Sequence, residues 1–280
     1  MRTPLFDPTR LSCSSICFRQ WSLSDALAAV RGLGFSHVDI GTLPGFCDHF
    51  NFLEASAAEE DAFLSTIRRS GLQVHTFTTN IGEFNEPGAP IERYLAAGRR
   101  NIRVAAAVGA YAINLNCGTW FDRSRQPFAE GIVPVAAGIR ALAPEAAASG
   151  VRLTIEAPHK GKLCRDADEA LALLQMIGHS NVTPMLDTNH HAAAGWGMAR
   201  AVEAFGARNI CLVHLRDAVH CENRYPLGAG EVNFRELFTA LRAGGYAGRY
   251  SFEFTDAAPT VDGNAAVIRA SREYLVNLNN

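Results

Sequence analysis

The sequence lacks a strong excess of either charge, since 26 lysine and arginine residues nearly balance 28 aspartate and glutamate residues. A net charge of -2 gives no bulk attraction to phosphate backbones or anionic membrane surfaces, so we expect no nucleic-acid and no membrane partner. The chain also lacks an apolar run near the ~18 residues of a membrane span, and residues 1–10 lack the apolar core of a signal peptide. We therefore expect a cytoplasmic protein.

The sequence also lacks the cysteine spacing of a zinc site and the glycine-rich turn of a nucleotide-binding fold. The seven cysteines contain no Cys-x-x-Cys pair, and only Cys13 and Cys17 lie as close as four residues apart, which argues against a zinc ribbon and favours reduced thiols. Residues 13–21, after the first expected strand, contain no glycine, whereas a doubly wound nucleotide-binding sheet would carry a glycine-rich turn there. No linker or low-complexity segment interrupts the chain.

Glycines followed by short apolar runs recur at intervals of roughly 30 to 40 residues, the size of one strand, one helix and two connections. They are Gly32, Gly71, Gly109, Gly150, Gly178, Gly206 and Gly245, each at the position where a helix commonly ends. The apolar runs predict strands at 11–17, 36–41, 72–77, 111–117, 151–156, 182–187, 210–214 and 249–254.

Helical periodicity fills the intervals between these strands, with Ser22 and Asp166 as N-cap residues of two of the helices. The helices are predicted at 22–31, 57–70, 91–108, 128–149, 167–177, 198–205, 234–243 and 265–278. Eight strand–helix units in this length predict an α/β fold, a (β/α)8 TIM barrel, with residues 1–280 as a single domain.

The long connections all follow strands, whereas the helix-to-strand links are short. In a (β/α)8 barrel the strand-to-helix loops lie at the C-terminal face, where they form the substrate pocket. The sequence therefore places the functional site at that face. The long loops are expected at 42–56, 78–90, 118–127, 188–197 and 216–233.

The last four predicted strands end in side chains that can bind a metal. Alternate residues of a barrel strand point inward, and this parity places Glu156, Asp187, His214 and Glu253 on the inner face. Burying three carboxylates without a cation would cost several kcal/mol per ion, which favours a metal site. An O,O,N,O ligand set suits one divalent ion, with Mn²⁺ preferred and Mg²⁺, Co²⁺, Zn²⁺ or Fe²⁺ tolerated.

These residues stand in a pattern that resembles the xylose isomerase-like TIM barrels, the sugar phosphate isomerase/epimerase group. This group includes hydroxypyruvate isomerases, ketose 3-epimerases, inosose isomerases and dehydratases, and endonuclease IV. The resemblance extends from GFSHVDI at residues 34–40 to GYAGRYSFE at residues 245–253. Its most specific pieces are Ile155-Glu156-x-x-His159, Asp187-x-x-His190, His214-Leu215-Arg216-Asp217 and Leu227-Gly228-x-Gly230-x-Val232.

The resemblance implies that Glu156, Asp187, His214 and Glu253 bind the metal, and that His190 and Arg216 contact substrate oxygens. The sequence departs from the family pattern at Asp39, where the second-strand acid is Glu, at Asn116, where several relatives have His, and at Arg216, where the family has Lys. Endonuclease IV would need further histidines and an Asp-x-His motif after the seventh strand to hold three metals, and residues 217–230 contain no Asp-x-His.

Further polar side chains near strand ends are expected to bind substrate hydroxyls: His159 and Lys160 after the fifth strand, His75 on the third and Asn116 on the fourth. Aromatic residues in the long loops can either cover a sugar ring or pack internally. These are Trp120, Phe121 and Trp196.

The ligand set predicts proton transfer beside a carbonyl, in which a divalent ion stabilises an enediolate and a carboxylate removes the carbon-bound proton. Glu156 and Glu253 are separated by two strands and are assigned as the catalytic acid–base pair. We therefore expect a metal-dependent isomerase or epimerase of a small sugar, polyhydroxy ketone or 2-oxo acid.

Three other functions stay open. Expulsion of a β-hydroxyl would make the protein a dehydratase (lyase) of an inosose or cyclic polyhydroxy-ketone acid, with His190 or His159 as the acid. A sugar- or metal-binding module without turnover is disfavoured by the intact pair Glu156 and Glu253, and a nuclease by its missing ligands. A homo-oligomer is expected only because such barrels commonly form one.

Overall fold

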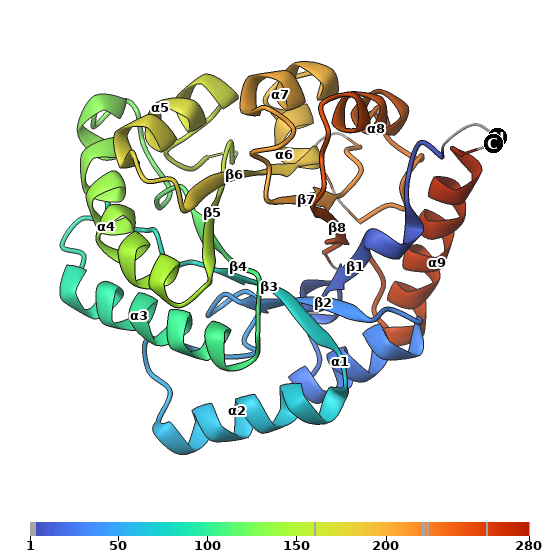
Figure 1. Cartoon of the computed structure of the whole chain (residues 1–280), viewed down its shortest axis with the longest axis horizontal. Coiled ribbons are helices and arrows are strands. Elements are labelled where there is room, and N and C mark those ends of the chain that lie inside the picture. The colour runs from blue at the N-terminus through green and yellow to red at the C-terminus, as the bar shows by residue number, and fades with distance from the viewer. Residues whose placement is uncertain (1–3, 160, 220–221, 223, 256, 280) are drawn as a thin grey trace.

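Eight parallel strands close on themselves in chain order, as the computed structural model shows for residues 4–159, 161–219, 222, 224–255 and 257–279 (Figure 1). β1 pairs with both β2 and β8, which closes the barrel and confirms the predicted (β/α)8 architecture. The strands are β1 (Leu11–Ser14), β2 (His37–Thr42), β3 (Gln73–Thr79), β4 (Ala112–Asn116), β5 (Arg152–Glu156), β6 (Val182–Asp187), β7 (Leu212–Leu215) and β8 (Arg249–Phe252).

Helices form a ring around the strands (Figure 1). The predicted N-caps are confirmed, because Ser22 accepts a hydrogen bond from the Asp25 amide and Asp166 accepts one from the Glu169 amide. The helices are α1 (Leu23–Gly32), α2 (Ala57–Ser70), α3 (Ile91–Ala107), α4 (Phe128–Ala148), α5 (Ala167–Ile177), α6 (Thr188–Ala193), α7 (Met198–Phe205), α8 (Phe234–Ala243) and α9 (Val261–Asn277), with short 3-10 turns η1 (Pro8–Arg10) and η2 (Ser15–Phe18).

The described segments nearest the two termini, around Phe6 and Asn279, lie side by side. The Phe6 amide donates to the Asn279 side-chain oxygen over 2.8 Å, and the Asn279 amide group donates back to the Phe6 carbonyl over 2.9 Å. These two bonds tie the segment before β1 to the last helix.

Several element boundaries differ from the sequence predictions. β1 ends at Ser14 because the next four residues turn into η2, and β8 ends at Phe252, so that Glu253 follows its strand directly. The short helix α6 was not predicted; it begins at once after β6 because the Asp187 carboxylate caps it by accepting from the His190 amide. β3 runs two residues beyond its predicted end, which changes the position of His75.

Six of the seven glycines predicted to end helices have a positive backbone φ, between +62° and +76°. The exception is the first, because Gly32 is the last residue of α1 and the left-handed residue is Gly34, with φ +79°.

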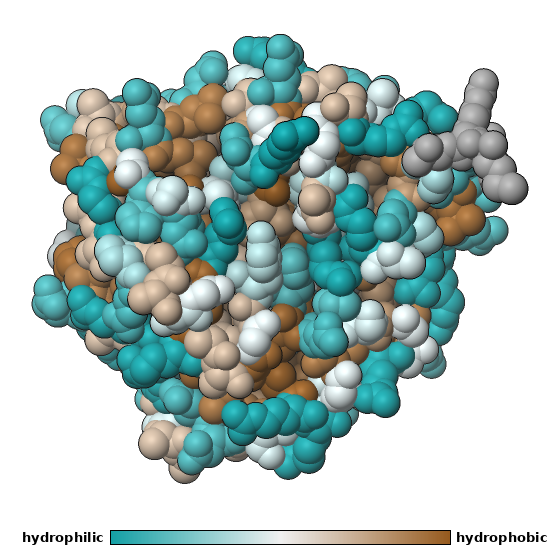
Figure 2. Space-filling model, viewed as in Figure 1, coloured by the Kyte–Doolittle hydropathy of each residue, from teal (hydrophilic) through white to brown (hydrophobic). Residues whose placement is uncertain are grey.

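On the face of the barrel seen in Figure 1, the space-filling view shows hydrophilic side chains over much of the surface, with smaller apolar areas between them (Figure 2).

The longest helix, α4, covers the barrel between α3 and α5 (Figure 1). Among the described residues it is the one helix long and apolar enough to cross a membrane, but half of its apolar stretch is buried inside this fold, as in a core helix. Its glycines give two loops close access to the helix. A Cβ at Gly138 would lie 2.4 Å from the Phe84 ring, and one at Gly131 would lie 2.5 Å from the Phe121 ring.

We expect Gly138→Ala to lower the free energy of unfolding by about 1–3 kcal/mol, because the added methyl would displace the buried Phe84 ring. Gly32→Ala is the matched control, since its Cβ would meet no atom within 4 Å and alanine favours helix by up to about 1 kcal/mol. Urea denaturation midpoints test the pair; equal midpoints would contradict the packing role of Gly138.

Candidate metal centre

Four side chains converge at the C-terminal end of the barrel. Glu156 and Asp187 are the last residues of β5 and β6, His214 lies on β7, and Glu253 directly follows β8. One potential ligand atom from each lies within 4.8 Å of the others, and all four side chains are buried. We call these four residues the ligand cluster.

The ligand cluster has the polar atoms that a metal ion would satisfy. The Asp187 Oδ2 and Glu253 Oε2 atoms and both ring nitrogens of His214 are buried and make no hydrogen bond of good geometry among the described residues; their polar contacts are ion pairs with Arg216, with Asp39 and within the cluster itself. Buried polar atoms in folded proteins are nearly always hydrogen-bonded, so this group is exceptional. Three carboxylates and one imidazole match the ligand preference of Mn²⁺, Mg²⁺ or Zn²⁺.

Outside the ligand cluster, Asp39 on β2 orients His214. Its Oδ2 atom lies 3.2 Å from the Nε2 atom of His214, while Thr78 on β3 donates to its Oδ1 over 3.0 Å. This leaves the Nδ1 atom of His214 facing Glu253, whose Oε2 lies 3.1 Å away. A carboxylate on the far nitrogen is the usual support for a metal-binding histidine.

Asp39 appeared in the sequence only as a departure from the family pattern, and its contact with His214 was not predicted. Its place on the inner face of β2 was the available signal. Asn114 on β4 was missed in the same way, although it donates to the Glu156 Oε2 atom over 3.2 Å.

Arg216 lies among the carboxylates of the ligand cluster. Its Nη2 atom is 2.5 Å from Asp187 Oδ2 and 3.6 Å from Glu156 Oε1, and its Nη1 atom is 3.3 Å from Glu253 Oε2. Burial alone would lower the pKa of Arg216, but these three carboxylates raise it above its usual value. The guanidinium therefore balances part of the buried negative charge.

The two glutamates experience different fields. Burial would raise the pKa of Glu156, but the hydrogen bond and charge of His190, with the charges of His214 and Arg216, hold it well below its usual value. Burial raises the pKa of Glu253, and the nearby His214 and Arg216 only partly oppose it. The cluster thus presents two carboxylates of unequal proton affinity.

His190 and His159 form a pair beside the ligand cluster. His190 Nε2 lies 3.4 Å from Glu156 Oε1, and the rings of His159 and His190 have centroids 3.9 Å apart. By contrast, His191 is fully buried, its ring packs edge-on against Phe205, and burial lowers its pKa to about 3. The neighbouring histidines therefore face different environments.

A cavity of about 570 Å³, here called the C-terminal cavity, opens above the ligand cluster. Its wall contains Glu83 from the loop after β3, which accepts from Asn116 Nδ2 over 3.2 Å and from Lys162 Nζ over 2.6 Å. Neither Glu83 nor Lys162 was predicted, because loop residues carry no parity signal. The predicted residues that line this cavity are Asn116, Glu156, His159, His190, Arg216 and Glu253; Lys160 lies outside the described residues.

The assignment of His75 to this site was wrong. β3 continues to Thr79, so His75 is the third residue of its strand and lies near the opposite mouth of the barrel. β2 pairs Val38 with Val74 but Asp39 with Thr76, which leaves His75 as an extra residue at a bulge. Of the three loop aromatics singled out in the sequence, Trp120, 70% exposed, lines the C-terminal cavity, whereas Phe121 and Trp196 are buried in the core.

Asp217, the last residue of the His-Leu-Arg-Asp motif, holds the following loop in place. Its carboxylate accepts hydrogen bonds from the amides of Ala218, Gly228, Gly230 and Val232 at 2.8–3.1 Å. A Cβ at Gly230 would lie 2.5 Å from Asp217 Oδ1, so the motif glycine is needed for this close approach. Asp217 therefore fixes the loop that follows Arg216.

The sequence pattern of the Xylose isomerase-like TIM barrel family matches residues 27–278. The chain belongs to this family. Among solved structures, a D-allulose 3-epimerase from Methylomonas sp. superposes on this xylose isomerase-like barrel with a TM-score of 0.75 and 20% identity, covering 96% of this chain and 97% of that one. The IOLI protein with a binding zinc atom superposes with a TM-score of 0.75 and 14% identity, covering 96% and 97%. Identities this low show the shared fold alone.

Two curated relatives of this xylose isomerase-like barrel are L-ribulose 3-epimerases. The enzymes of Methylomonas sp. (strain DH-1) and Mesorhizobium japonicum (strain LMG 29417 / CECT 9101 / MAFF 303099) are each 32% identical to it over 119 residues. That stretch is 42% of this chain and 40% and 38% of the two relatives. The match thus spans about two fifths of the relatives' length.

We expect Asp39→Asn to weaken Mn²⁺ binding to this xylose isomerase-like barrel by about 10–100-fold, because the variant loses the charge that supports His214. Titration of metal-free protein with Mn²⁺, followed by electron paramagnetic resonance, measures the change. The exposed Asp61 supplies the control variant, Asp61→Asn. Equal affinities in wild type, D39N and D61N would contradict the supporting role of Asp39.

Proposed function

We propose that this protein is a divalent-metal-dependent epimerase or isomerase of a small ketose or related polyhydroxy ketone. The observation that carries the proposal is the ligand cluster beside a cavity of about 570 Å³, with Glu156 and Glu253 both lining that cavity. A cavity of this volume can hold a monosaccharide. The similarity to L-ribulose 3-epimerases supports epimerisation at C3 of a ketose as the reaction to test first.

Glu156, Asp187, His214 and Glu253 would hold the metal ion, and Mn²⁺ is the ion we prefer. When bound, such an ion polarises a carbonyl group and stabilises the negative charge that develops when the neighbouring carbon loses its proton. Asp39 would keep the His214 ring in position, and Arg216 would supply a second positive charge beside the same carboxylates.

Glu156 and Glu253 are the residues we assign to proton transfer. They reach the cavity from β5 and from the end of β8, with β6 and β7 between them. One carboxylate would remove the carbon-bound proton from one face of the substrate, and the other would return a proton to the opposite face, which inverts the carbon. Removal of a proton from C1 of the ketose and return of a proton to C2 would instead give aldose–ketose isomerisation.

The substrate hydroxyls would meet the polar wall of the C-terminal cavity. His190, His159 and Asn116 offer hydrogen-bonding groups there, and the Lys162–Glu83 ion pair adds a donor and acceptors. The exposed ring of Trp120 lies at the rim, where it can cover an apolar face of a sugar.

A dehydratase is the second candidate. His190 lies 3.4 Å from Glu156 and against His159, so an imidazole beside the ligand cluster could protonate a departing hydroxyl. Epimerisation leaves the water content of the substrate unchanged, whereas this reaction releases one water.

Our expectations for compartment, assembly and domain organisation stay predictions. We propose that residues 1–280 act as one domain, which the pairing of β1 with β8 supports, that the protein works in the cytoplasm, and that it can form a homo-oligomer.

We expect the Mn²⁺-loaded protein to incorporate solvent deuterium at C3 of a ketose in D₂O and to form the C3 epimer, as NMR would show. The panel contains ketopentoses, ketohexoses, hydroxypyruvate and inososes. Glu156→Gln and Glu253→Gln should each lower kcat by at least about 10²-fold, because each removes an acid–base group. Chelation should abolish turnover, and added Mn²⁺ should restore it.

Glu273→Gln serves as the matched control, because Glu273 is exposed on α9 and lies outside the cavity. Loss of water from an inosose, without epimer formation, would replace the proposal by the dehydratase. No deuterium incorporation into any panel compound would reject both enzymatic reactions and favour a binding module.

A further inference from the structure

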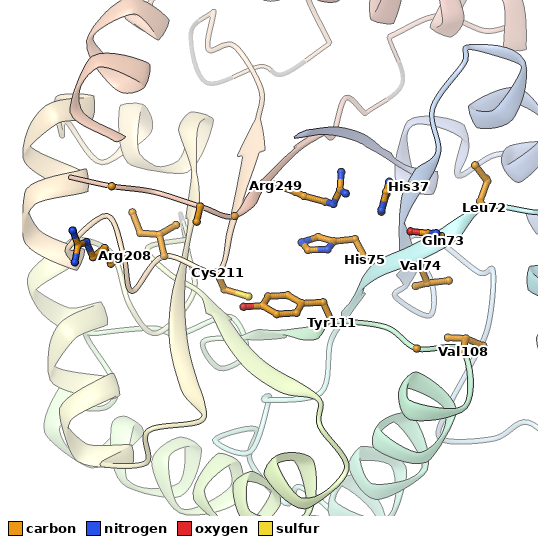
Figure 3. A pocket seen from close by; sticks show the side chains of 15 residues that line it. His37, Leu72, Gln73, Val74, His75, Val108, Tyr111, Arg208, Cys211 and Arg249 are labelled. Atoms are coloured by element: carbon orange, nitrogen blue, oxygen red, sulfur yellow. The ribbon is translucent and has the colours of Figure 1, made fainter. Parts of the chain in front are cut away.

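A second cavity lies at the opposite, N-terminal mouth of the barrel. Its volume is about 880 Å³, and it is formed by the first residues of β2, β3 and β8 and by the segments that precede β4 and β7. His37, His75, Tyr111, Arg208 and Arg249 line it, and no acidic side chain is among its lining residues (Figure 3). We call it the N-terminal cavity; none of the residues assigned to proton transfer or metal binding contributes to it.

Three basic side chains come together in this cavity. Arg249, His37 and His75 lie near one another and project into the same space from β8, β2 and β3 (Figure 3). Arg249 uses one Nη1 hydrogen bond, to the Thr9 carbonyl at 3.2 Å, and His37 Nδ1 lies 2.9 Å from Ser36 Oγ. The other guanidinium nitrogen atoms of Arg249 face the cavity, and none of the lining residues supplies a carboxylate to pair with them.

His75 is the most unusual member of the group. It is only 8% exposed, and its Nε2 atom has no hydrogen-bond partner among the described residues. Its ring stacks on Tyr111, with centroids 5.3 Å apart and planes 8° from parallel, so the imidazole is held in one orientation. An unpaired buried ring nitrogen beside a guanidinium is the group that an oxygen atom of a ligand would satisfy.

The positive charge of Arg249 is poorly compensated in this mouth, and the two histidines beside it are held neutral. The pKa of Arg249 is lowered by burial and then by Arg10, with Asp7 the one carboxylate that opposes the shift. Burial and the charges of Arg249 and His37 lower the pKa of His75 to about 3, and burial and Arg249 lower that of His37. Arg10 itself stacks on Tyr246 and Tyr250 and donates to the Gly248 carbonyl, so it is held near the cluster.

We propose that the N-terminal cavity is a binding site for a phosphate-bearing small molecule. The Arg249 guanidinium would pair with two phosphate oxygens, the geometry for which its planar fork is suited, and His75 and His37 would donate ring N–H groups to the others. The stacked Tyr111 and His75 rings form part of the lining. The volume exceeds that of inorganic phosphate and leaves room for an organic group such as a sugar.

The test is a titration of the full-length protein with inorganic phosphate at constant ionic strength, with chloride as the balancing anion. Histidine ring resonances, assigned with single His→Gln variants, report which end of the barrel responds. We expect saturable shifts of the His75 and His37 resonances, with those of His190 and His214 unchanged. Arg249→Gln should weaken phosphate binding at least tenfold.

Two further variants keep the result interpretable. Arg269→Gln, on the exposed side of α9 and outside the cavity, should bind phosphate as the wild type does. If Arg249→Gln fails to fold, Arg249→Lys retains the charge but loses the two-pronged geometry, and it should still bind phosphate more weakly than the wild type; equal affinity would contradict the role of the guanidinium. Circular dichroism and melting temperature verify the fold of each variant.

The ligand's organic part is tested by comparing glucose 6-phosphate with inorganic phosphate and with glucose. Tighter binding of the sugar phosphate would indicate a phosphorylated metabolite, and equal binding would indicate that phosphate alone is recognised. The proposal is overturned if the His75 shift does not saturate, if it is the same in R249Q as in wild type, or if phosphate moves only resonances at the C-terminal end.

Discussion

The buried negative charge at the C-terminal end of the barrel is the constraint on which the site depends. Four carboxylates, those of Asp39, Glu156, Asp187 and Glu253, lie with one imidazole and one guanidinium in a space that water hardly reaches. Even with His214 and Arg216 both cationic, negative charge remains in excess, and unpaired buried charge is strongly destabilising. A divalent cation at the ligand cluster, with His214 as a neutral ligand, would offset most of the charge of the carboxylates and bind the atoms that lack well-formed hydrogen bonds.

The fold serves this site by separating two tasks. Short parallel strands fix the ligands, because β5, β6 and β7 each carry one near the C-terminal end and Glu253 follows β8 at once. The loops form the walls of the cavity and are themselves anchored. Phe84 packs against Gly138 and so fixes the position of the neighbouring Glu83. Asp217 accepts hydrogen bonds from four backbone amides of its own loop. The opposite mouth of the barrel carries a separate, basic cavity.

The sequence alone was enough to predict the repeated strand–helix units and the inward-facing residues of alternating strand positions. Glycine exits and strand parity predicted the closed barrel, and parity also predicted that Glu156, Asp187 and His214 face inward together. Contacts that depend on strand register or loop conformation were beyond it, such as the support of His214 by Asp39 and the Lys162–Glu83 pair. His75 was misplaced for the same reason: one bulge in β3 and two extra strand residues moved it to the other mouth, and local propensity encodes neither.

The central claim, that the ligand cluster holds one divalent ion, is tested most directly by diffraction from crystals grown with Mn²⁺, measured at the manganese absorption edge. The account predicts one anomalous peak per chain, about 2.0–2.3 Å from oxygen atoms of Glu156, Asp187 and Glu253 and from the Nδ1 atom of His214. A peak bound by other residues, or no peak while Arg216 still bridges Asp187 and Glu253, would contradict it.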